Sequence, residues 1–183
     1  MTLKTDLREF PAALRERLYT DLCDCLEGIT DGKKQVIQYF DLYNNQFAHL
    51  AEETVLRYPC VLVEFSSIKW RSIGCGVQQA SVQMTLYVAA KITNGKTFRL
   101  LGRKNEMDNL SYLRLLDAIH NRLRTLRLPY AGSFVRRSSI TDHDHDALVV
   151  SAETYTVVCN DTSGVMKTVK VKKKGIDISL IRR

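Results

Sequence analysis

The residues whose types and spacing could do chemistry gather in one short stretch, residues 141–146, which reads TDHDHD. Carboxylate and imidazole groups bind metal ions and transfer protons. In an extended chain, however, successive side chains point to opposite sides, so His143 and His145 would face away from Asp144. A metal site would therefore need a curled loop and further ligands from elsewhere, for which the candidates are His49, His120 and Glu64.

The same stretch has a second interpretation, as a polar turn between two strands. Aspartate side chains hydrogen-bond backbone groups in turns and tolerate the dihedral angles that turns require. The sequence contains neither HExxH nor the glycine spacing of an EF-hand loop. We therefore favour a structural turn, and keep His143, His145 and Asp144 as the ligands of the alternative, a metal-dependent hydrolase.

Other catalytic patterns are weaker still. Ser138 and Ser139 lie in no glycine elbow, and Cys75 lies between two glycines with no histidine near it in the sequence. No glycine-rich phosphate-binding motif occurs. The five cysteines are scattered and odd in number, which favours reduced thiols in a cytoplasm over a disulfide framework. We expect no enzymatic activity and no cofactor.

The net charge of +7 comes almost entirely from one end of the chain. Residues 165–183 hold seven basic residues and one acid, net +6, which leaves 20 basic and 19 acidic residues before them. We therefore expect a single domain over residues 1–164 and a basic arm over residues 165–183. The lysines at 170–174 could bind a phosphate backbone, or protect an edge strand from unwanted pairing. Neither a signal peptide nor a membrane span is expected, because apolar runs are short.

Apolar residues at three- and four-residue steps predict two amphipathic helices. The first runs from about residue 7, with Asp6 as its N-cap, to Gly28 or Gly32. The second ends before Pro129. The apolar sides are predicted to consist of Phe10, Leu14, Leu18, Leu22, Cys25 and Ile29 in the first helix, and of Leu110, Leu113, Leu116, Ile119, Leu123 and Leu126 in the second.

Four strands are predicted around these helices. Residues 60–70 are rich in β-branched and aromatic types and should be covered on both faces. After a turn at residues 72–76, residues 77–91 alternate between apolar and polar types, which indicates one buried and one accessible face. Two further strands flank TDHDHD. We expect an α+β fold, a mostly antiparallel sheet of about four strands with both helices on one face.

From residue 36 to residue 160 the order of elements and several short passages resemble a known family. The passages are DLYNNQFAHLAEETVLRYPCVLVEFSSIKWR, the alternating strand VQMTLYVAAKI, the helix LRLLDAIHNRL and finally SSITDHDHDALVVSAETYTVVC. Together they resemble the tail-terminator or tail-completion proteins of long-tailed bacteriophages. The positions that carry the resemblance are Asp41, Leu42, Asn44, Gln46, Glu52, Glu53, Pro59, Val61, Val63, Glu64, Phe65, Trp70 and the Asp/His turn.

The resemblance implies a structural virion protein. Such proteins form a ring, typically a hexamer, on the head-proximal end of the tail tube, where the ring stops tube growth and joins the tail to the head connector. The implied partners are further copies of the chain, the tail tube protein, connector proteins and DNA in the lumen, with assembly in the host cytoplasm. A head-side connector protein is the alternative. The expected contact residues are Gln79, Gln83 and Tyr87 on the polar strand face, Trp70 as an interface anchor, and Lys170, Lys172, Lys173 and Lys174 in the arm.

Overall fold

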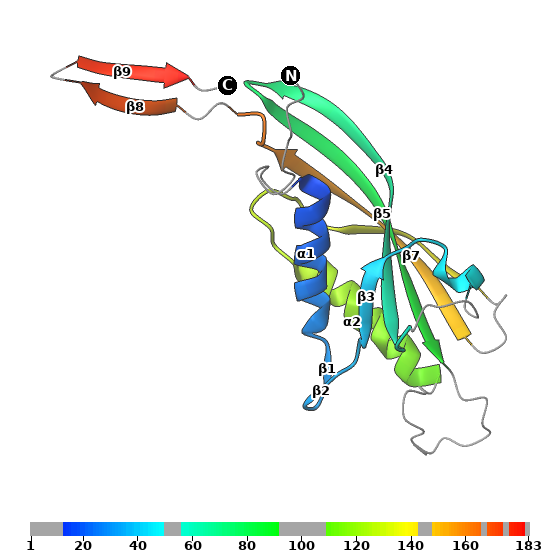
Figure 1. Cartoon of the computed structure of the whole chain (residues 1–183). Helices are drawn as coiled ribbons and strands as arrows, with labels where there is room; N and C mark the ends of the chain where they lie inside the picture. The colour runs from blue at the N-terminus through cyan, green and yellow to red at the C-terminus, as the bar shows by residue number, and fades with distance from the viewer. Residues whose placement is uncertain are drawn as a thin grey trace.

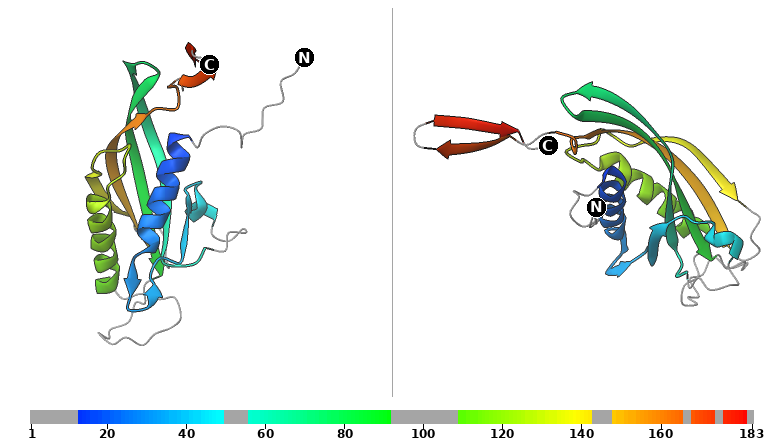
Figure 2. Two further views of the ribbon diagram at one scale, coloured as in Figure 1. Left: turned by 90° about the vertical axis from the view of Figure 1, so that its left-hand side faces the viewer. Right: turned by 45° about the horizontal axis from the view of Figure 1, so that its top comes forward.

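The computed structural model describes residues 13–49, 56–91, 109–142, 148–165, 168–173 and 176–181. A five-stranded sheet carries two long helices on one face, so the fold is α+β as expected. The helices α1 (Leu14–Glu27) and α2 (Asn109–Thr125) lie next to each other along that face (Figures 1 and 2). Neither is long and apolar enough to cross a membrane.

The sheet has one more strand than the sequence predicted, and it is mixed. Its strands, in spatial order, are β3 (Tyr39–Leu42), β4 (Cys60–Gly74), β5 (Val77–Lys91), β7 (Leu148–Asp161) and β6 (Val135–Asp142). The unexpected strand is β3, which pairs in parallel with β4, whereas the other pairs are antiparallel. Its four residues are too few to show a period of two, so the sequence predicted about four strands where there are five. The sheet is mostly antiparallel, as expected.

Short elements link α1 to the sheet. The two-residue strands β1 (Thr30–Asp31) and β2 (Lys34–Gln35) form a small hairpin after α1. A 3₁₀ helix, Gln46–His49, follows β3. These connections bring the chain from the end of α1 back along the sheet to β4.

Strand β5 confirms the alternating pattern and is central in the sheet. It pairs with β4 on one side and with β7 along its full length on the other. Its even-numbered residues from Ala80 to Ala90 face the helices and are fully buried, because one side of a strand receives every second residue. These residues are Ala80, Val82, Met84, Leu86, Val88 and Ala90.

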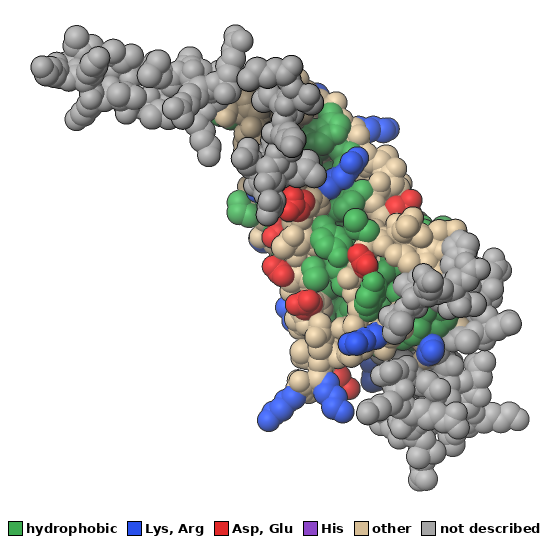
Figure 3. Space-filling view, viewed as in Figure 1, with side chains coloured by type: hydrophobic (Ala, Val, Ile, Leu, Met, Phe, Trp, Pro, Cys, Tyr) green, Lys and Arg blue, Asp and Glu red, His purple; other side chains and the backbone are tan. Residues whose placement is uncertain are grey.

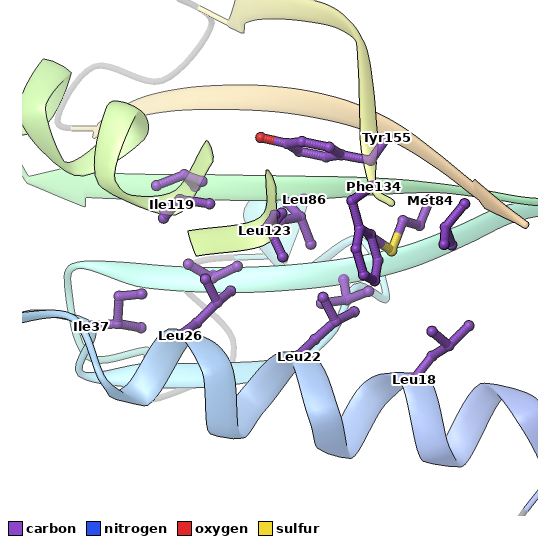
Figure 4. Close-up of a cluster of buried hydrophobic side chains, with 14 of the residues drawn as sticks. Leu18, Leu22, Leu26, Ile37, Met84, Leu86, Ile119, Leu123, Phe134 and Tyr155 are labelled. Atoms are coloured by element: carbon purple, nitrogen blue, oxygen red, sulfur yellow. The ribbon is translucent and has the colours of Figure 1, made fainter. Parts of the chain in front are cut away.

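The main core lies between this sheet face and the two helices (Figure 4). Leu18, Leu22 and Leu26 descend from α1, four residues apart, and all are fully buried. Ile119 and Leu123 reach the same region from α2. Burying each such side chain contributes about 1.5–3 kcal/mol, so this interface is the main source of stability in the domain.

Both helices differ from their predictions in detail. Helix α1 begins at Leu14 with Ala13 as its N-cap, so the predicted start was wrong; Asp6 lies outside the described residues. Its end at Gly28 is confirmed. In α2 the buried side is turned relative to the prediction: Tyr112, Leu115, Ile119 and Leu123 are buried. Leu110 and Leu113, predicted to be in the core, are 50% and 56% exposed.

Strand β4 matches its predicted burial only in its first half. Its first four residues are buried on both faces, but residues 69–74 are exposed. The strand continues to Gly74, so the turn is shorter than the predicted one at residues 72–76. Gly74, Cys75 and Gly76 all have positive φ, which suits two glycines flanking one strained residue. The β4 and β5 strands thus form a long hairpin that extends beyond the helices (Figure 1).

A second, smaller core covers part of the other sheet face. Phe47, Tyr58 and Leu62 pack there with residues from β5 and β7. Tyr43 stacks on Tyr87 at 4.1 Å between ring centroids. The remaining buried members are Cys60, Ala89, Leu148 and Val150. This core explains why β4 begins with residues buried on both faces.

The C-terminal arm folds as a separate two-stranded sheet. Strand β8 (Thr168–Lys173) pairs antiparallel with β9 (Ile176–Ile181) over six residue pairs. Figure 1 shows this hairpin lying apart from the five-stranded sheet. The arm, predicted to pair or dock, therefore pairs with itself within the described residues.

Candidate interaction surface

The most extensive candidate site is the part of the sheet that neither helix nor the second core covers. We call it the open face. Strand register places Gln79 beside Asn160, Ser81 beside Val158, and Gln83 beside Thr156. The strands β4 and β6 extend it on both sides. Its residues are Ser67, Lys69, Arg71, Gln79, Ser81, Gln83, Val135, Arg137, Ser138, Ile140, Thr154, Thr156, Val158 and Asn160.

Hydrogen bonds from side chains link neighbouring strands across the open face. Gln79 Nε2 donates to Asn160 Oδ1 at 3.4 Å, and Arg137 Nε donates to Thr156 Oγ1 at 2.8 Å. The Ser66 hydroxyl donates to the carbonyl oxygen of Gln83 at 3.3 Å. Exposed apolar side chains lie among these polar groups, with Val158 at 49% and Ile140 at 64% exposure. Mixed amide, hydroxyl and apolar groups of this kind are typical of protein interfaces.

The open face and helix α1 differ in charge. The open face holds Lys69, Arg71 and Arg137, whereas the acids on the same side of the sheet, Glu64 and Asp142, lie near Tyr43 of the second core. On the opposite side, the exposed residues of α1 include Glu16, Asp24 and Glu27 beside Arg15. The neighbouring α2 is basic, with Arg114, Arg122 and Arg124 against Asp117. Figure 3 views that side and shows acidic side chains along the helix. One surface of the chain is therefore electrostatically complementary to another surface of the same chain.

The predicted contact residues divide between accessible and enclosed positions. Gln79 is half-buried and Gln83 exposed, both on the open face, where they were expected. Tyr87 lies at the edge of the second core and donates a hydrogen bond to Glu64 Oε2 at 2.8 Å. Burial, and then the bond to Glu64, raises the pKa of Tyr87 well above its usual value. The polar face is thus accessible only as far as Gln83, since Thr85 and Ala89 are buried.

The other predicted contacts lie at the far end of the sheet or beyond it. Trp70 is 46% exposed on the helix side of β4, where it pairs with Ala80 in register. Lys170, Lys172 and Lys173 belong to β8, whereas Lys174 lies outside the described residues. His143, Asp144 and His145 also lie outside them. Within the described part of the chain, no three His, Cys, Asp or Glu residues are placed to share a metal ion.

The residues that carry the family resemblance have structural roles at one end of β3. Tyr39 donates to Asp41 Oδ2 at 2.7 Å, and the backbone N–H of Leu42 donates to Asp41 Oδ1 at 2.8 Å. Gln46 bridges this turn, since its amide donates to the carbonyl of Leu42 and its oxygen accepts from the N–H of Asn44. Val61 and Val63 belong to the main core, while Glu52 and Glu53 lie outside the described residues.

A buried polar cluster on the helix side escaped the sequence reasoning. Glu153 on β7 is 3% exposed, accepts a hydrogen bond from Ser139 and forms an ion pair with Arg136 at 3.5 Å. His120 Nδ1 lies 3.5 Å from the hydroxyl of the neighbouring Tyr155. Burial and the nearby Arg136 lower the pKa of His120. The only sequence signal was an acid at a helix-facing position of an alternating strand.

A shallow pocket of about 370 Å³ lies between α1 and the segment before β6. Its polar groups are already engaged: Arg17 lies over the ring of Tyr130 at 3.9 Å, and the Tyr130 hydroxyl donates to Asp21. Glu16, Thr20 and Pro129 complete the lining. These contacts join α1 to the chain after α2, which is a structural role.

Compared with protein-family models and with curated protein sequences, the chain gives no match.

Proposed function

We propose that this protein is a structural component of a bacteriophage tail, a tail terminator that forms a ring at the head-proximal end of the tail tube. The observation that carries the proposal is that each copy has both an uncovered sheet face with basic side chains and, on the other side of the sheet, a helix α1 with net negative charge. A ring needs two different, complementary surfaces on each subunit, since each copy contacts the next head to tail. The resemblance over residues 36–160 supplies the tail context.

The proposed subunit contact brings the open face of one copy against α1 of the next. Lys69 and Arg71 would then lie opposite Glu16, Asp24 and Glu27. Gln79 and Gln83 contribute hydrogen-bonding groups at the centre of the contact. The long β4–β5 hairpin, with Trp70 exposed near its tip, extends beyond the helices and is available to the tube protein or the connector. This role requires complementary binding surfaces on each subunit.

The decisive experiment is electron microscopy of particles assembled in cells that lack this protein. Overlong or variable tails without heads are expected for a terminator, because nothing then stops tube growth. Separated heads and tails of normal length would instead identify a head-side connector. Complete, normal particles would rule out both roles.

A charge-reversed variant tests the proposed surface in the same assay. Lys69→Glu with Arg71→Glu should fail to restore tail length when supplied in place of the natural protein, since the open face would repel α1 of its neighbour. The matched control is Lys33→Glu with Lys34→Glu, two exposed lysines on the small β1–β2 hairpin, which should restore it. Equal activity of both variants would remove the open face from the ring contact.

A further inference from the structure

The register of the β8–β9 hairpin gathers apolar residues on one of its faces. Register places Val169 opposite Leu180 and Val171 opposite Ile178, so these residues share one face of the hairpin, together with the Lys173–Ile176 pair at its end. The other face is mainly polar and consists of Thr168, Lys170, Lys172, Asp177, Ser179 and Ile181. An isolated two-stranded hairpin is at most marginally stable in water. An amphipathic hairpin of this kind therefore needs a surface to pack on.

The sheet offers an open edge at β6. Among the described residues this strand pairs only with β7, and its residues from Val135 to Thr141 are all exposed. A register shift between Arg136 and Ser138 disturbs the first half of the strand, whereas Ser138–Asp142 pairs regularly with β7. An unpaired strand edge presents a row of backbone donors and acceptors to an incoming strand.

An apolar flank of α2 lies above this edge. His120 extends from α2 to Tyr155 on β7, the strand next to β6, so this side of the helix points toward β6. Leu116 and Leu113 lie four and seven residues before His120, which places them on the same side. Leu113 is 56% exposed there, and Leu110 one turn earlier is 50% exposed. If a strand were added to β6, the apolar face of that strand would lie next to these exposed leucines.

The charges on the two hairpin strands favour β9 as the strand that pairs with β6. Strand β6 carries Arg136 and Arg137. Strand β8 contains three lysines, at positions 170, 172 and 173, which would be brought next to these arginines. Strand β9 contains no basic residue and has an acid at Asp177. Like charges on adjacent strands are destabilising, so β9 is the compatible edge.

The chain's own hairpin points away from this site. After β7, residues 162–165 form a turn, and Gly164 packs against the backbone of Gly76 at the tip of the β4–β5 hairpin. From there the hairpin continues away from the sheet (Figure 1). Leu113 lies instead near Ser151, because the hydroxyl of the neighbouring Tyr112 donates a hydrogen bond to Ser151. Ser151 precedes Asp161, at the end of β7, by ten residues, which is about 33 Å of strand.

We infer that the β8–β9 hairpin of a second copy adds to β6 through β9, extends the sheet by two strands, and packs its apolar face under the α2 flank at Leu110 and Leu113. The contact is head to tail, since the hairpin of each copy engages the edge of the next. The inference rests on the self-association that the proposed ring requires, and adds a specific interlock to it.

The test uses the full-length protein with a photoreactive phenylalanine analogue in place of Leu113, mixed with an equal amount of isotopically labelled natural protein. After illumination and digestion, the tryptic peptide of residues 175–182, which contains β9, should be attached in both labelled and unlabelled forms. The same analogue in place of Ile73, an exposed apolar residue on the β4–β5 hairpin, is the matched control and should not capture this peptide. Ile178→Gln should abolish capture at position 113.

Each alternative result has a definite meaning. Capture of the unlabelled peptide alone would show that the hairpin docks within its own chain, and would overturn the second-copy contact. Capture of other peptides, or of none, would overturn the docking site. Either failure leaves the tail-length experiment unaffected, because overlong tails would still identify a terminator assembled through other contacts. Conversely, capture in trans with normal tails would retain the interlock and reject the terminator role.

Discussion

At the scale of single residues, the least expected feature is a buried acid held by two neighbours on the adjacent strand. Glu153 accepts from Ser139 and pairs with Arg136, and its burial makes any loss of a partner costly. The sequence around it, SSITDHDHDALVVSAETYTVV, drew attention to the aspartates and histidines instead. The polar group with the largest structural consequence is therefore outside the most conspicuous motif.

Replacing Arg136 tests this cluster. We expect Arg136→Ala to lower the free energy of unfolding by about 1–3 kcal/mol, because it leaves a buried carboxylate with one partner fewer. The adjacent Arg137→Ala is the control: Arg137 is exposed and bonds a threonine on the surface, so its loss should cost at most about 0.5–1 kcal/mol. Urea denaturation of both variants measures the difference, and equal losses would contradict a special role for the Glu153 pair.

At the scale of elements, the long β4–β5 hairpin depends on its turn. Gly76 has a φ of +77°, and a Cβ at this position would collide with the carbonyl oxygen of Gly164. The same contact anchors the turn at residues 162–165 that leads into the β8–β9 hairpin. One glycine thereby couples the tip of the sheet to the start of the arm.

We expect Gly76→Ala to destabilise the protein by about 2–4 kcal/mol, from the left-handed backbone and the collision together. Gly32→Ala is the control, since Gly32 has a similar φ of +61° with no atom within 4 Å of an added Cβ. It should cost only the backbone strain of about 1–2 kcal/mol. Thermal unfolding in parallel separates the two contributions, and identical melting temperatures would show that Gly164 moves aside freely.

At the scale of the whole molecule, the raised pKa values of the tyrosines make the stability of the fold depend on pH in the alkaline range. Burial raises the pKa of Tyr58 and of Tyr112 to about 12. In Tyr39 the pKa rises to about 12 as well, chiefly through the hydrogen bond to Asp41. The remaining tyrosines, Tyr19, Tyr43, Tyr87, Tyr130 and Tyr155, shift in the same direction.

An unfolded tyrosine loses its proton near pH 10, whereas these folded tyrosines keep theirs to higher pH. The unfolded state then binds fewer protons than the folded state, so stability falls as pH rises above about 10 toward 12. Denaturant titrations at a series of pH values should show this loss, together with delayed tyrosinate absorbance in the folded protein. Tyrosinate formation near pH 10 without unfolding would contradict the buried hydroxyls.

The sequence by itself determined the two long helices, the four long strands of the sheet and the buried side of β5. Its even-numbered residues are apolar without exception from Ala80 to Ala90, and a strand can place them only on one face. The same alternation predicted that Gln79 and Gln83 lie on the accessible face of this strand. The apolar arm was likewise expected to pair, since a purely solvated tail would not alternate valine with lysine.

Only the tertiary structure decided what covers each surface. Periodicity shows that Leu110, Leu113 and Tyr87 belong to patterned segments, but packing partners distant in the sequence decide their exposure. The second core, formed by residues near Tyr43, Phe47 and Tyr58, encloses the end of a strand face that the sequence presented as uniformly polar. Long-range contacts of this kind, including the parallel pairing of β3 with β4, leave no periodic trace in either segment because each contributes only a few residues.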